Sequence, residues 1–387
     1  MLVSLTFPLT LLQIKYLYIL PAIFKSQSNI GMKHNFNAGP SILPKEVFEE
    51  ASRAILDFNG TGLSILEIGH RTPLFEDVLN EAVSLVKELM QLNDEKEVLF
   101  LHGGASTQFF QIPMNFLPKD KKAAYLDGGV WGSKAIKEAQ KFGEVEIVAS
   151  SKDKNYSYIP KGYAIPEDAV YLHYTTNNTI EGTQMKAIPE SGIPLIADMS
   201  SDILSCKMDF NRFSFIYAGA QKNIGAAGVN LVIIDKSFAE KASVSVPSMM
   251  DYRQHIANGS MLNTPPVFAI YVCLLTLRWL KKIGGITAIE KQNLEKSNLL
   301  YSTLEASPVF HLPVPKEDRS HMNAVFTMKD PTLEKLFLEK CIAEGMVGVK
   351  GHRSVGGFRV SMYNALSLES VQAFTDLAKA FSNQYGS

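Results

Sequence analysis

The chain is poor in cysteine, carries almost no net charge and contains no internal repeat or low-complexity tract. Its three cysteines, Cys206, Cys273 and Cys341, are far apart in the sequence and form no C-x-x-C pair. This spacing argues against a disulfide framework or a zinc site and predicts reduced thiols in the cytoplasm. The formal net charge of −1 argues against a basic surface for nucleic acid. We therefore expect neither a metal nor a nucleic-acid partner.

Apolar runs long enough for a membrane are also scarce. The one candidate, residues 2–24, is interrupted by Lys15, Pro8 and Pro21 and is not preceded by a basic segment. A membrane span needs about 20 mostly apolar residues, and a signal peptide needs a basic start and a clean cleavage site. We therefore expect no membrane anchor. We interpret residues 1–31 as an N-terminal extension that is disordered or absent from the working protein.

The remainder has the composition of a globular protein, with 46% hydrophobic and 20% charged residues among 387. Apolar runs typical of strands alternate with segments of helical periodicity. We predict strands at 97–101, 123–126, 145–148, 169–173, 194–197, 213–218 and 229–234. We predict helices at 44–58, 75–92, from about 106, 132–142 and 268–283. This alternation predicts an α/β fold with a mainly parallel sheet between two layers of helices.

The C-terminal part has a different pattern. A long helix after residue 284 leads into a segment with strands at 323–328 and 358–361 and helices at 332–344 and 368–381. This mixture predicts a smaller α+β domain. We assign residues 47–285 to a large domain, and residues 32–46 with 286–387 to the small one.

Two residues that end apolar runs suggest a particular chemistry. Asp198 ends the run IPLIAD, and Lys222 follows another apolar run in the string YAGAQKNIG. A lysine that forms a Schiff base and an aspartate that pairs with a pyridinium nitrogen are the minimal apparatus for pyridoxal phosphate. The pair alone is also compatible with an ordinary solvated lysine, so the surrounding motifs decide between the two interpretations.

These motifs occur in a characteristic order along almost the whole chain after residue 32. They occupy residues 36–40, 69–71, 102–109, 127–131, 173–174, 178–182, 197–198, 218–225, 263–266, 350–353 and 356–359. Together they resemble the phosphoserine aminotransferase family, a class V group within the fold-type I pyridoxal phosphate enzymes. The resemblance implies a seven-stranded, mainly parallel sheet in the large domain.

The resemblance also implies a set of residues that bind the cofactor. Lys222 would form the Schiff base, and Asp198 would pair with the ring nitrogen. Each of the other positions has a structural alternative as a turn, a cap or a core aromatic residue. The further expected contacts are Ala105, Ser106 and Gln221 to the phosphate, Trp131 stacked on the ring, and Thr179 to the phenolate oxygen.

Two more expected contacts imply a homodimer with shared active sites. Asn263 and Thr264 match residues that reach the cofactor phosphate from a second subunit, although the string Asn-Thr-Pro-Pro is also typical of a turn. Ser106 departs from an arginine found in some relatives, which affects how many guanidinium groups reach the substrate.

Five basic residues are expected to bind the anionic groups of the substrates. Arginine binds carboxylate and phosphate through two parallel hydrogen bonds. By resemblance, Arg359 would bind the α-carboxylate, and His70, Arg71, His352 and Arg353 would bind the distal anion. The implied reaction converts glutamate and 3-phosphohydroxypyruvate into 2-oxoglutarate and phosphoserine, with 4-phosphohydroxy-L-threonine formation in pyridoxine biosynthesis as a related activity.

Three alternatives remain open at the level of the sequence. One is another fold-type I transaminase, of the alanine–glyoxylate or serine–pyruvate type, which would not need two His-Arg pairs. A cysteine desulfurase would need a cysteine on a mobile polar loop, which the sequence does not offer. A scaffold without catalysis would not need Lys222, Asp198 and Trp131 together.

Overall fold

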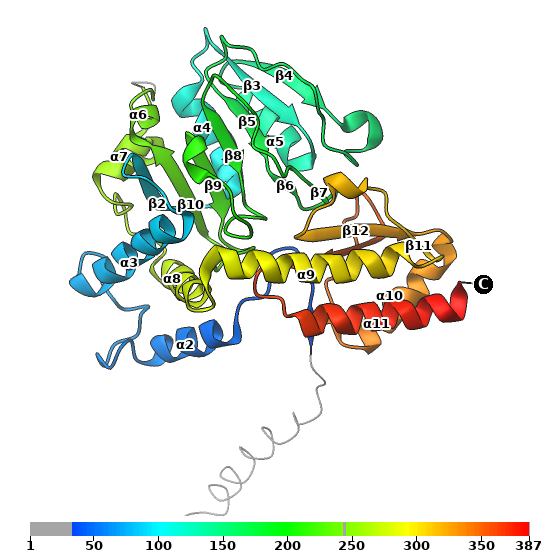
Figure 1. The fold of residues 1–387 in the computed structure, drawn as a ribbon. Helices are drawn as coiled ribbons and strands as arrows, with labels where there is room; N and C mark the ends of the chain where they lie inside the picture. Colours follow the sequence, from blue (N-terminus) through cyan, green and yellow to red (C-terminus); the bar gives the residue numbers. More distant parts are fainter. Residues whose placement is uncertain (1–32, 243–244, 387) are drawn as a thin grey trace, which may run out of the picture.

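The computed structural model describes residues 33–242 and 245–386 (Figure 1). The N-terminal extension that we interpreted from residues 1–31 therefore lies outside the described residues. Within the described part of the chain, no helix is both long and apolar enough to cross a membrane.

A seven-stranded sheet forms the centre of the larger part of the molecule. Its strands lie in the order β2-β10-β9-β8-β5-β3-β4. All neighbouring pairs are parallel except those of β10, which runs antiparallel to β2 and β9. This confirms the predicted α/β fold with a mainly parallel sheet. The bounds are β2 Lys96–His102, β3 Lys122–Asp127, β4 Glu144–Ser150, β5 Leu172–Thr175, β8 Leu195–Asp198, β9 Phe215–Gly219 and β10 Val229–Asp235.

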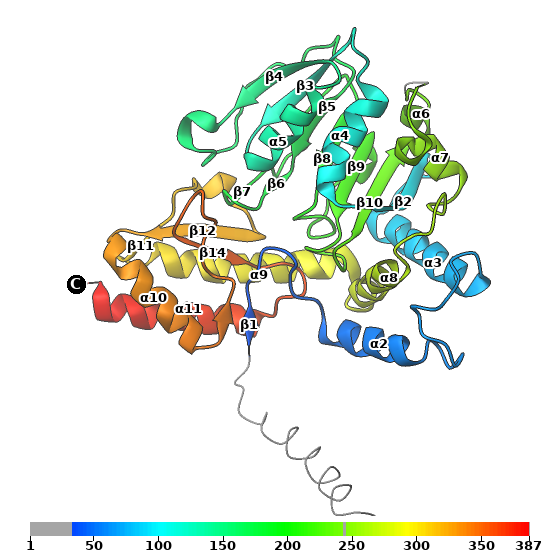
Figure 2. The same cartoon turned by 180° about the vertical axis from the view of Figure 1, so that it is seen from behind.

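Helices cover both faces of this sheet (Figures 1 and 2). One hydrophobic cluster joins one face to α2 (Lys45–Leu56), α3 (Pro73–Met90) and α8 (Val267–Lys282). A second cluster joins the opposite face to α4 (Ala105–Phe116) and α5 (Val130–Ala139). Because alternate side chains of a strand point to opposite faces, strands buried on both sides are apolar at nearly every position. This explains why these strands were visible in the sequence as continuous apolar runs.

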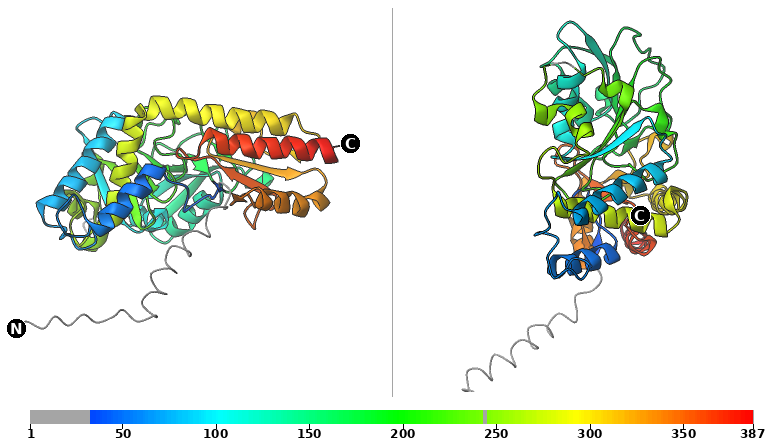
Figure 3. Two further views of the ribbon diagram at one scale, coloured as in Figure 1. Left: turned by 90° about the horizontal axis from the view of Figure 1, so that it is seen from below. Right: turned by 90° about the vertical axis from the view of Figure 1, so that its left-hand side faces the viewer.

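A smaller unit lies beside the large sheet and has its own hydrophobic cluster. Its sheet contains β11 (Phe310–His311), β12 (Asn323–Met328) and β14 (Phe358–Ser361), all antiparallel. Three helices pack with this sheet, and α9 and α11 run side by side in the view from below (Figure 3). Their bounds are α9 Gly285–Glu305, α10 Glu334–Ala343 and α11 Leu368–Tyr385.

The start of the described chain belongs with this smaller unit. Strand β1 (His34–Asn35) pairs in parallel with β13 (Met346–Val347). Phe36 is fully buried in the third cluster, with its ring edge-on to Phe374 at 5.7 Å. These contacts support the proposal that residues 32–46 and 286–387 form the small domain.

Several short elements were not predicted. They are the strands β1, β11 and β13, the hairpin strands β6 (Asn177–Asn178) and β7 (Thr183–Gln184), the helices α6 (Lys236–Ala239) and α7 (Tyr252–Ala257), and the 3-10 turns Lys152–Lys154, Phe210–Arg212, Ser248–Met250, Lys316–Asp318 and Pro331–Leu333. Elements of two to six residues carry too little periodicity to be recognised.

The β6–β7 hairpin depends on a glycine, and this yields a stability prediction. Gly182 has φ +78°, and a Cβ there would lie 2.9 Å from Cγ2 of Val325. Gly162 has a similar φ of +73°, but a Cβ at that position would meet nothing within 4 Å. Placing alanine at a left-handed position costs about 1–2 kcal/mol. Overpacking adds about 1–3 kcal/mol.

We therefore expect Gly182→Ala to lower the free energy of unfolding in urea more than Gly162→Ala does. The difference between the two variants should be about 1–3 kcal/mol, the overpacking contribution alone. An equal loss of unfolding free energy in the two variants would show that Val325 in β12 can move to make room for the added methyl group. That result would contradict this account of the hairpin.

Candidate active site

The carboxyl ends of four parallel strands bring polar residues to one edge of the sheet. Strands β3, β5, β8 and β9 end at Asp127, Thr175, Asp198 and Gly219. In the register, Thr175 pairs with Asp198, and Asp198 pairs with Tyr217. Ligands of open α/β sheets bind outside the carboxyl ends of the strands. The same edge therefore carries the residues that the sequence singled out.

Asp198 is buried and accepts two hydrogen bonds from one residue. Its Oδ1 accepts from the backbone nitrogen of Ser200 at 2.9 Å and from the Ser200 hydroxyl at 2.6 Å. Burial raises the pKa of Asp198, whereas the charge of Lys222 and the bonds from Ser200 lower it. The donors thus favour an ionised carboxylate in a place that water hardly reaches.

Lys222 lies in the turn after β9 and points toward the β6–β7 hairpin. Its Nζ donates to the Thr179 hydroxyl at 2.8 Å, and its carbonyl oxygen accepts a hydrogen bond from the Ser41 hydroxyl. Burial lowers the pKa of Lys222 to about 8, although the negative charge of Asp198 acts in the opposite direction. A substantial fraction of this amine is therefore uncharged near neutral pH, as a nucleophile or base requires.

An aromatic face lies next to this amine. Trp131, in the first turn of α5, has its ring centroid 5.7 Å from Nζ of Lys222 and 4.2 Å from Nζ of Lys134. The ring is partly buried, and its Nε1 has no hydrogen-bond partner within the described residues. The indole therefore offers a flat apolar surface beside Lys222.

Arg359 brings strand β14 of the smaller unit to the same place. Its Nη1 donates to the carbonyl oxygen of Thr179 at 3.3 Å, and its Nε is buried without a partner in the described chain. Burial lowers the pKa of Arg359. Thr179 thus contacts Arg359 through its carbonyl and Lys222 through its hydroxyl, and the guanidinium keeps donors for an anion.

Positive charge accumulates around this guanidinium. Burial lowers the pKa of His352. The positive charges of Arg359, Arg353 and Lys134 lower it further. Lys134 is the residue of this group that sequence reasoning missed, because a lysine on a helix is usually a solvated side chain. The concentration of cations indicates a site for an anion.

Ala105 and Ser106 open helix α4, directly after strand β2. The cap residue, Gly104, is extended, and no side chain caps the helix. Gly103 before it has φ +89°, a conformation that favours glycine. The first backbone N–H groups of α4 are thus left for an anion, which the helix dipole also favours.

Two predicted residues contact the end of β2 rather than Lys222. Nδ2 of Asn263 is 3.3 Å from Nε2 of His102, at the end of β2, and the carbonyl oxygen of Thr264 is 2.8 Å from the same nitrogen. Among the residues that the structure describes, neither of the two forms a hydrogen bond with Lys222. Gln221 is adjacent to Lys222 in the chain, and its carbonyl accepts from the backbone nitrogen of Ser41 at 3.0 Å.

His70 and Arg71 lie just before α3, in the connection from α2. This connection lies at the end of the molecule away from β12 and β14 (Figures 1 and 2). Arg71 is exposed. Within the described residues, neither His70 nor Arg71 forms a hydrogen bond with His352 or Arg353, and the shared distal-anion pocket stays a prediction.

The described residues at this edge fit pyridoxal phosphate. They provide an amine, a buried carboxylate, an aromatic face and a helix start free for a phosphate. In addition, several polar atoms close to this edge are buried without partners in the part of the chain that the structure describes, among them Trp131 Nε1, Asn178 Oδ1, Glu181 Oε2, Arg359 Nε, Asp127 Oδ1 and Thr175 Oγ1. Glu181 and Ser200 are site residues that sequence reasoning missed, although Glu181 falls within the motif at 178–182.

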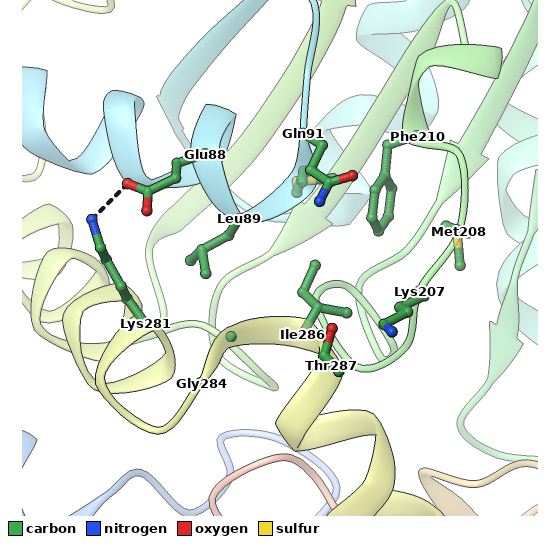
Figure 4. A pocket seen from close by; sticks show the side chains of 12 residues that line it. Glu88, Leu89, Gln91, Lys207, Met208, Phe210, Lys281, Gly284, Ile286 and Thr287 are labelled. Atoms are coloured by element: carbon green, nitrogen blue, oxygen red, sulfur yellow. Dashed lines mark hydrogen bonds and ion pairs between the residues drawn. The ribbon is translucent and has the colours of Figure 1, made fainter.

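A separate cavity of about 450 Å³ lies between the end of α3 and the start of α9 (Figure 4). It is lined in part by Glu88 and Lys281, which form an ion pair at 2.7 Å, and by Lys207. It shares no residue with the edge of the sheet described above. It is therefore not the predicted site.

Comparisons with known proteins agree with this geometry. The family model described as aminotransferase class-V matches residues 33–374. The chain is 54% identical over 353 residues to a phosphoserine aminotransferase of Flavobacterium psychrophilum, covering 91% of this chain and 99% of the relative.

Solved structures give the same result. A phosphoserine aminotransferase from Bacillus circulans subsp. alkalophilus superposes with a TM-score of 0.89 at 42% identity, covering 91% of this chain and 99% of the other. A phosphoserine aminotransferase from Trichomonas vaginalis with bound pyridoxal phosphate superposes with a TM-score of 0.86 at 35% identity, covering 90% and 100%.

The lowered pKa of Lys222 predicts its reactivity. In protein freed of cofactor, reductive methylation of Lys222 should rise with pH around a midpoint of about 8, whereas lysine in a short peptide titrates near about 10.4. Because the charge of Asp198 raises the pKa of Lys222, Asp198→Asn should move the midpoint below that of the wild type. Mass spectrometry of the labelled peptide measures both. A midpoint that rises in Asp198→Asn would contradict the proposed interaction of the two charges.

Proposed function

We propose that this chain, which belongs to the aminotransferase class-V family, is a phosphoserine aminotransferase. Such an enzyme reversibly transfers the amino group of glutamate to 3-phosphohydroxypyruvate and so yields phosphoserine and 2-oxoglutarate. The observation that carries the substrate assignment is the group of positive charges from Arg359, Arg353 and Lys134 around His352, of which Arg359 also acts on the amine of Lys222. Both substrates carry at least two anionic groups, which such a group of cations would bind.

The cofactor is pyridoxal phosphate, which when bound supplies a carbonyl carbon for the amino group and a ring that withdraws electrons. Lys222 holds it through Nζ. The same amine, with its pKa of about 8, then moves the proton at Cα of the amino-acid substrate. A base with a pKa near the working pH serves this purpose best.

The other residues assigned to the cofactor would orient pyridoxal phosphate. Asp198, whose ionised form is favoured against burial by the charge of Lys222 and the hydrogen bonds from Ser200, would hold the proton on the ring nitrogen. Trp131 would support one face of the ring, and the Thr179 hydroxyl, which accepts from Lys222 in this structure, would donate to the phenolate oxygen. The phosphate would be held by Ala105 and Ser106 at the start of α4 and by Gln221.

Arg359 binds the α-carboxylate that all the substrates share. Its unpaired Nε and its position beside Thr179 support this role. His352 and Arg353 bind the distal group, which is a phosphate in one substrate pair and a carboxylate in the other. One pocket must accept both in turn, because the two half-reactions use a single site.

We also propose a homodimer in which the partner copy completes each site. Asn263 and Thr264 would reach the partner's cofactor phosphate, and His70 and Arg71 would join the partner's distal-anion pocket. The support is that, within the described residues of one chain, Asn263 and Thr264 bond to His102 and not to Lys222. Exposed apolar side chains around the same α2–α3 connection, which a second copy would cover, are Phe48, Leu56, Leu63, Leu66 and Leu74.

The cysteines argue against a desulfurase. Burial raises the pKa of Cys206, Cys273 and Cys341, in each case to about 12. A nucleophilic cysteine instead needs a lowered pKa. Three unpaired thiols support a reducing compartment, and we propose the cytoplasm. Formation of 4-phosphohydroxy-L-threonine in pyridoxine biosynthesis is a second proposed activity of the same pocket.

The substrate assignment predicts different effects for two arginines. Arg359→Ala should slow the half-reactions with glutamate and with phosphoserine alike, because both present an α-carboxylate. Arg353→Ala should slow the half-reaction with phosphoserine more than the half-reaction with glutamate. The difference should be roughly tenfold to a hundredfold, the value of a charge-assisted bidentate contact. Single-turnover measurements with each amino donor separate the two effects.

Arg212→Ala is the matched control, because Arg212 pairs with Glu190 at 3.1 Å in another part of the molecule. Serine, which lacks the phosphate, should be a poor amino donor for the wild type. Turnover with serine equal to that with phosphoserine would refute the substrate assignment, and an unchanged phosphoserine rate in Arg353→Ala would remove Arg353 from the pocket.

The shared site predicts complementation between inactive subunits. Lys222→Ala should abolish transamination, because no other group supplies the amine. Thr264→Trp should block the phosphate position in the partner. In a mixed dimer one of the two sites carries neither change, so activity should return on mixing. Absence of recovery after subunit exchange has been verified by native mass spectrometry would refute the shared site.

A further inference from the structure

A buried histidine and a buried tyrosine lie on the same face of the sheet as Asp198. Tyr217 on β9 is the register partner of Asp198. His173 on β5 is the register partner of Ile196, two residues before Asp198. Because side chains alternate along a strand, those of His173, Tyr217 and Asp198 project from one face. All three are at most 3% exposed.

The imidazole of His173 is fixed between two phenol rings. Its Nε2 lies 3.0 Å from the hydroxyl oxygen of Tyr217, and the two rings stack at a centroid distance of 5.9 Å. On the other side, the ring of Tyr125 stacks on His173 at 4.8 Å. The hydroxyl of Tyr125 bonds to that of Tyr171 at 2.9 Å. Tyr125 thus supports the imidazole without being part of the path to Asp198.

The available donors and acceptors fix the direction of the path. Burial lowers the pKa of His173 to about 3, so the ring is neutral and carries one N–H. Its Nδ1 is buried with no partner among the described residues. A proton on Nδ1 would leave a buried donor unpaired and would take the phenol proton of Tyr217 away from Asp198. A proton on Nε2 satisfies more groups, because His173 then donates to Tyr217, and Tyr217 donates onward.

The Tyr217 hydroxyl favours the ionised form of the Asp198 carboxyl group. Burial raises the pKa of Asp198, and the hydrogen bond from Tyr217 acts with Lys222 and Ser200 against that rise. Burial, and after it the charge of Asp198, raises the pKa of Tyr217. Since Oδ1 of Asp198 already accepts from Ser200, Tyr217 supplies a donor from a different element. Chains of hydrogen bonds in a low-dielectric interior strengthen one another.

We propose that His173 acts through Tyr217 as a positioning residue for Asp198, holding the carboxylate ionised and aimed at the ring nitrogen of bound pyridoxal phosphate. This rests on the proposed function, which assigns Asp198 to that nitrogen. The titratable groups that face Asp198 are Lys222, after β9, and Asp202, in the turn after β8. The surrounding phenols of Tyr125, Tyr171 and Tyr252 stay neutral because burial raises the pKa of each.

The test compares two deletions of a buried hydroxyl. Tyr217→Phe removes the donor to Asp198, and Tyr125→Phe removes a hydroxyl from the other ring that stacks on His173. The measured quantity is the dissociation constant for pyridoxal phosphate across the pH range from about 5 to about 9, on either side of neutral, where histidine and perturbed carboxyl groups titrate.

Loss of the donor raises the pKa of Asp198, so the carboxylate is ionised only at higher pH. The acid limb of the binding profile should therefore move to higher pH in Tyr217→Phe, with affinity on that limb falling roughly tenfold. The profile of Tyr125→Phe should coincide with that of the wild type. If the profiles of Tyr217→Phe and Tyr125→Phe coincide instead, the proposal is overturned.

A second pair of variants tests His173 itself. His173→Gln keeps an N–H donor near the position of Nε2 and should retain the wild-type acid limb. His173→Leu keeps bulk without a donor and should shift the limb as Tyr217→Phe does. Equal profiles for the Gln and Leu variants would overturn the role of His173, even if one tyrosine variant fails to fold. Failure of the wild type to bind pyridoxal phosphate would instead refute the proposed function.

Discussion

Asp198 and Lys222 share a place from which water is largely excluded, and the rest of the site depends on how this burial is offset. Burial raises the pKa of Asp198 and lowers that of Lys222, and each charge opposes the change in the other. Two buried charges are tolerated only with good hydrogen bonds. Ser200 supplies them to the carboxylate, and Thr179 accepts from the amine. The Asp198 side chain thus depends on the turn after β8, and the Lys222 side chain depends on the β6–β7 hairpin.

The smaller unit is attached to this same pair. The Ser41 hydroxyl donates to the carbonyl of Lys222, and the hydroxyl of Tyr363 donates to the carbonyl of Ala38 at 2.8 Å. Arg359 reaches Thr179 from β14. The turn that carries the amine is therefore in contact with both units. A shift of the smaller unit would therefore move the amine of Lys222 and the guanidinium of Arg359 together.

Sequence reasoning succeeded where a residue ends a buried strand. Asp198 and Lys222 were identifiable because the apolar runs before them are unmistakable. The long helices and the seven strands followed from the same periodicity, with ends that differ by up to four residues. The pairing of Asp198 with Tyr217 could not be predicted, because it depends on which strands become neighbours. His173 was hidden for a related reason, since one polar residue within an apolar strand looks the same whether it is functional or simply buried.

The charges of the site are balanced only when an anion is present. Arg359, Arg353 and Lys134 place positive charge around His352. Among the charges that act on Arg359, Glu181 is the one carboxylate of the described chain. Burial raises the pKa of Glu181, and one of its oxygens already accepts from the backbone nitrogen of Val130 at 2.9 Å. Glu181 is thus a weak counterion. Cations held in place before the ligand arrives need no reorganisation when it binds, and the more negative charge the ligand brings, the more repulsion it relieves. A phosphate therefore gains more from this site than a carboxylate does.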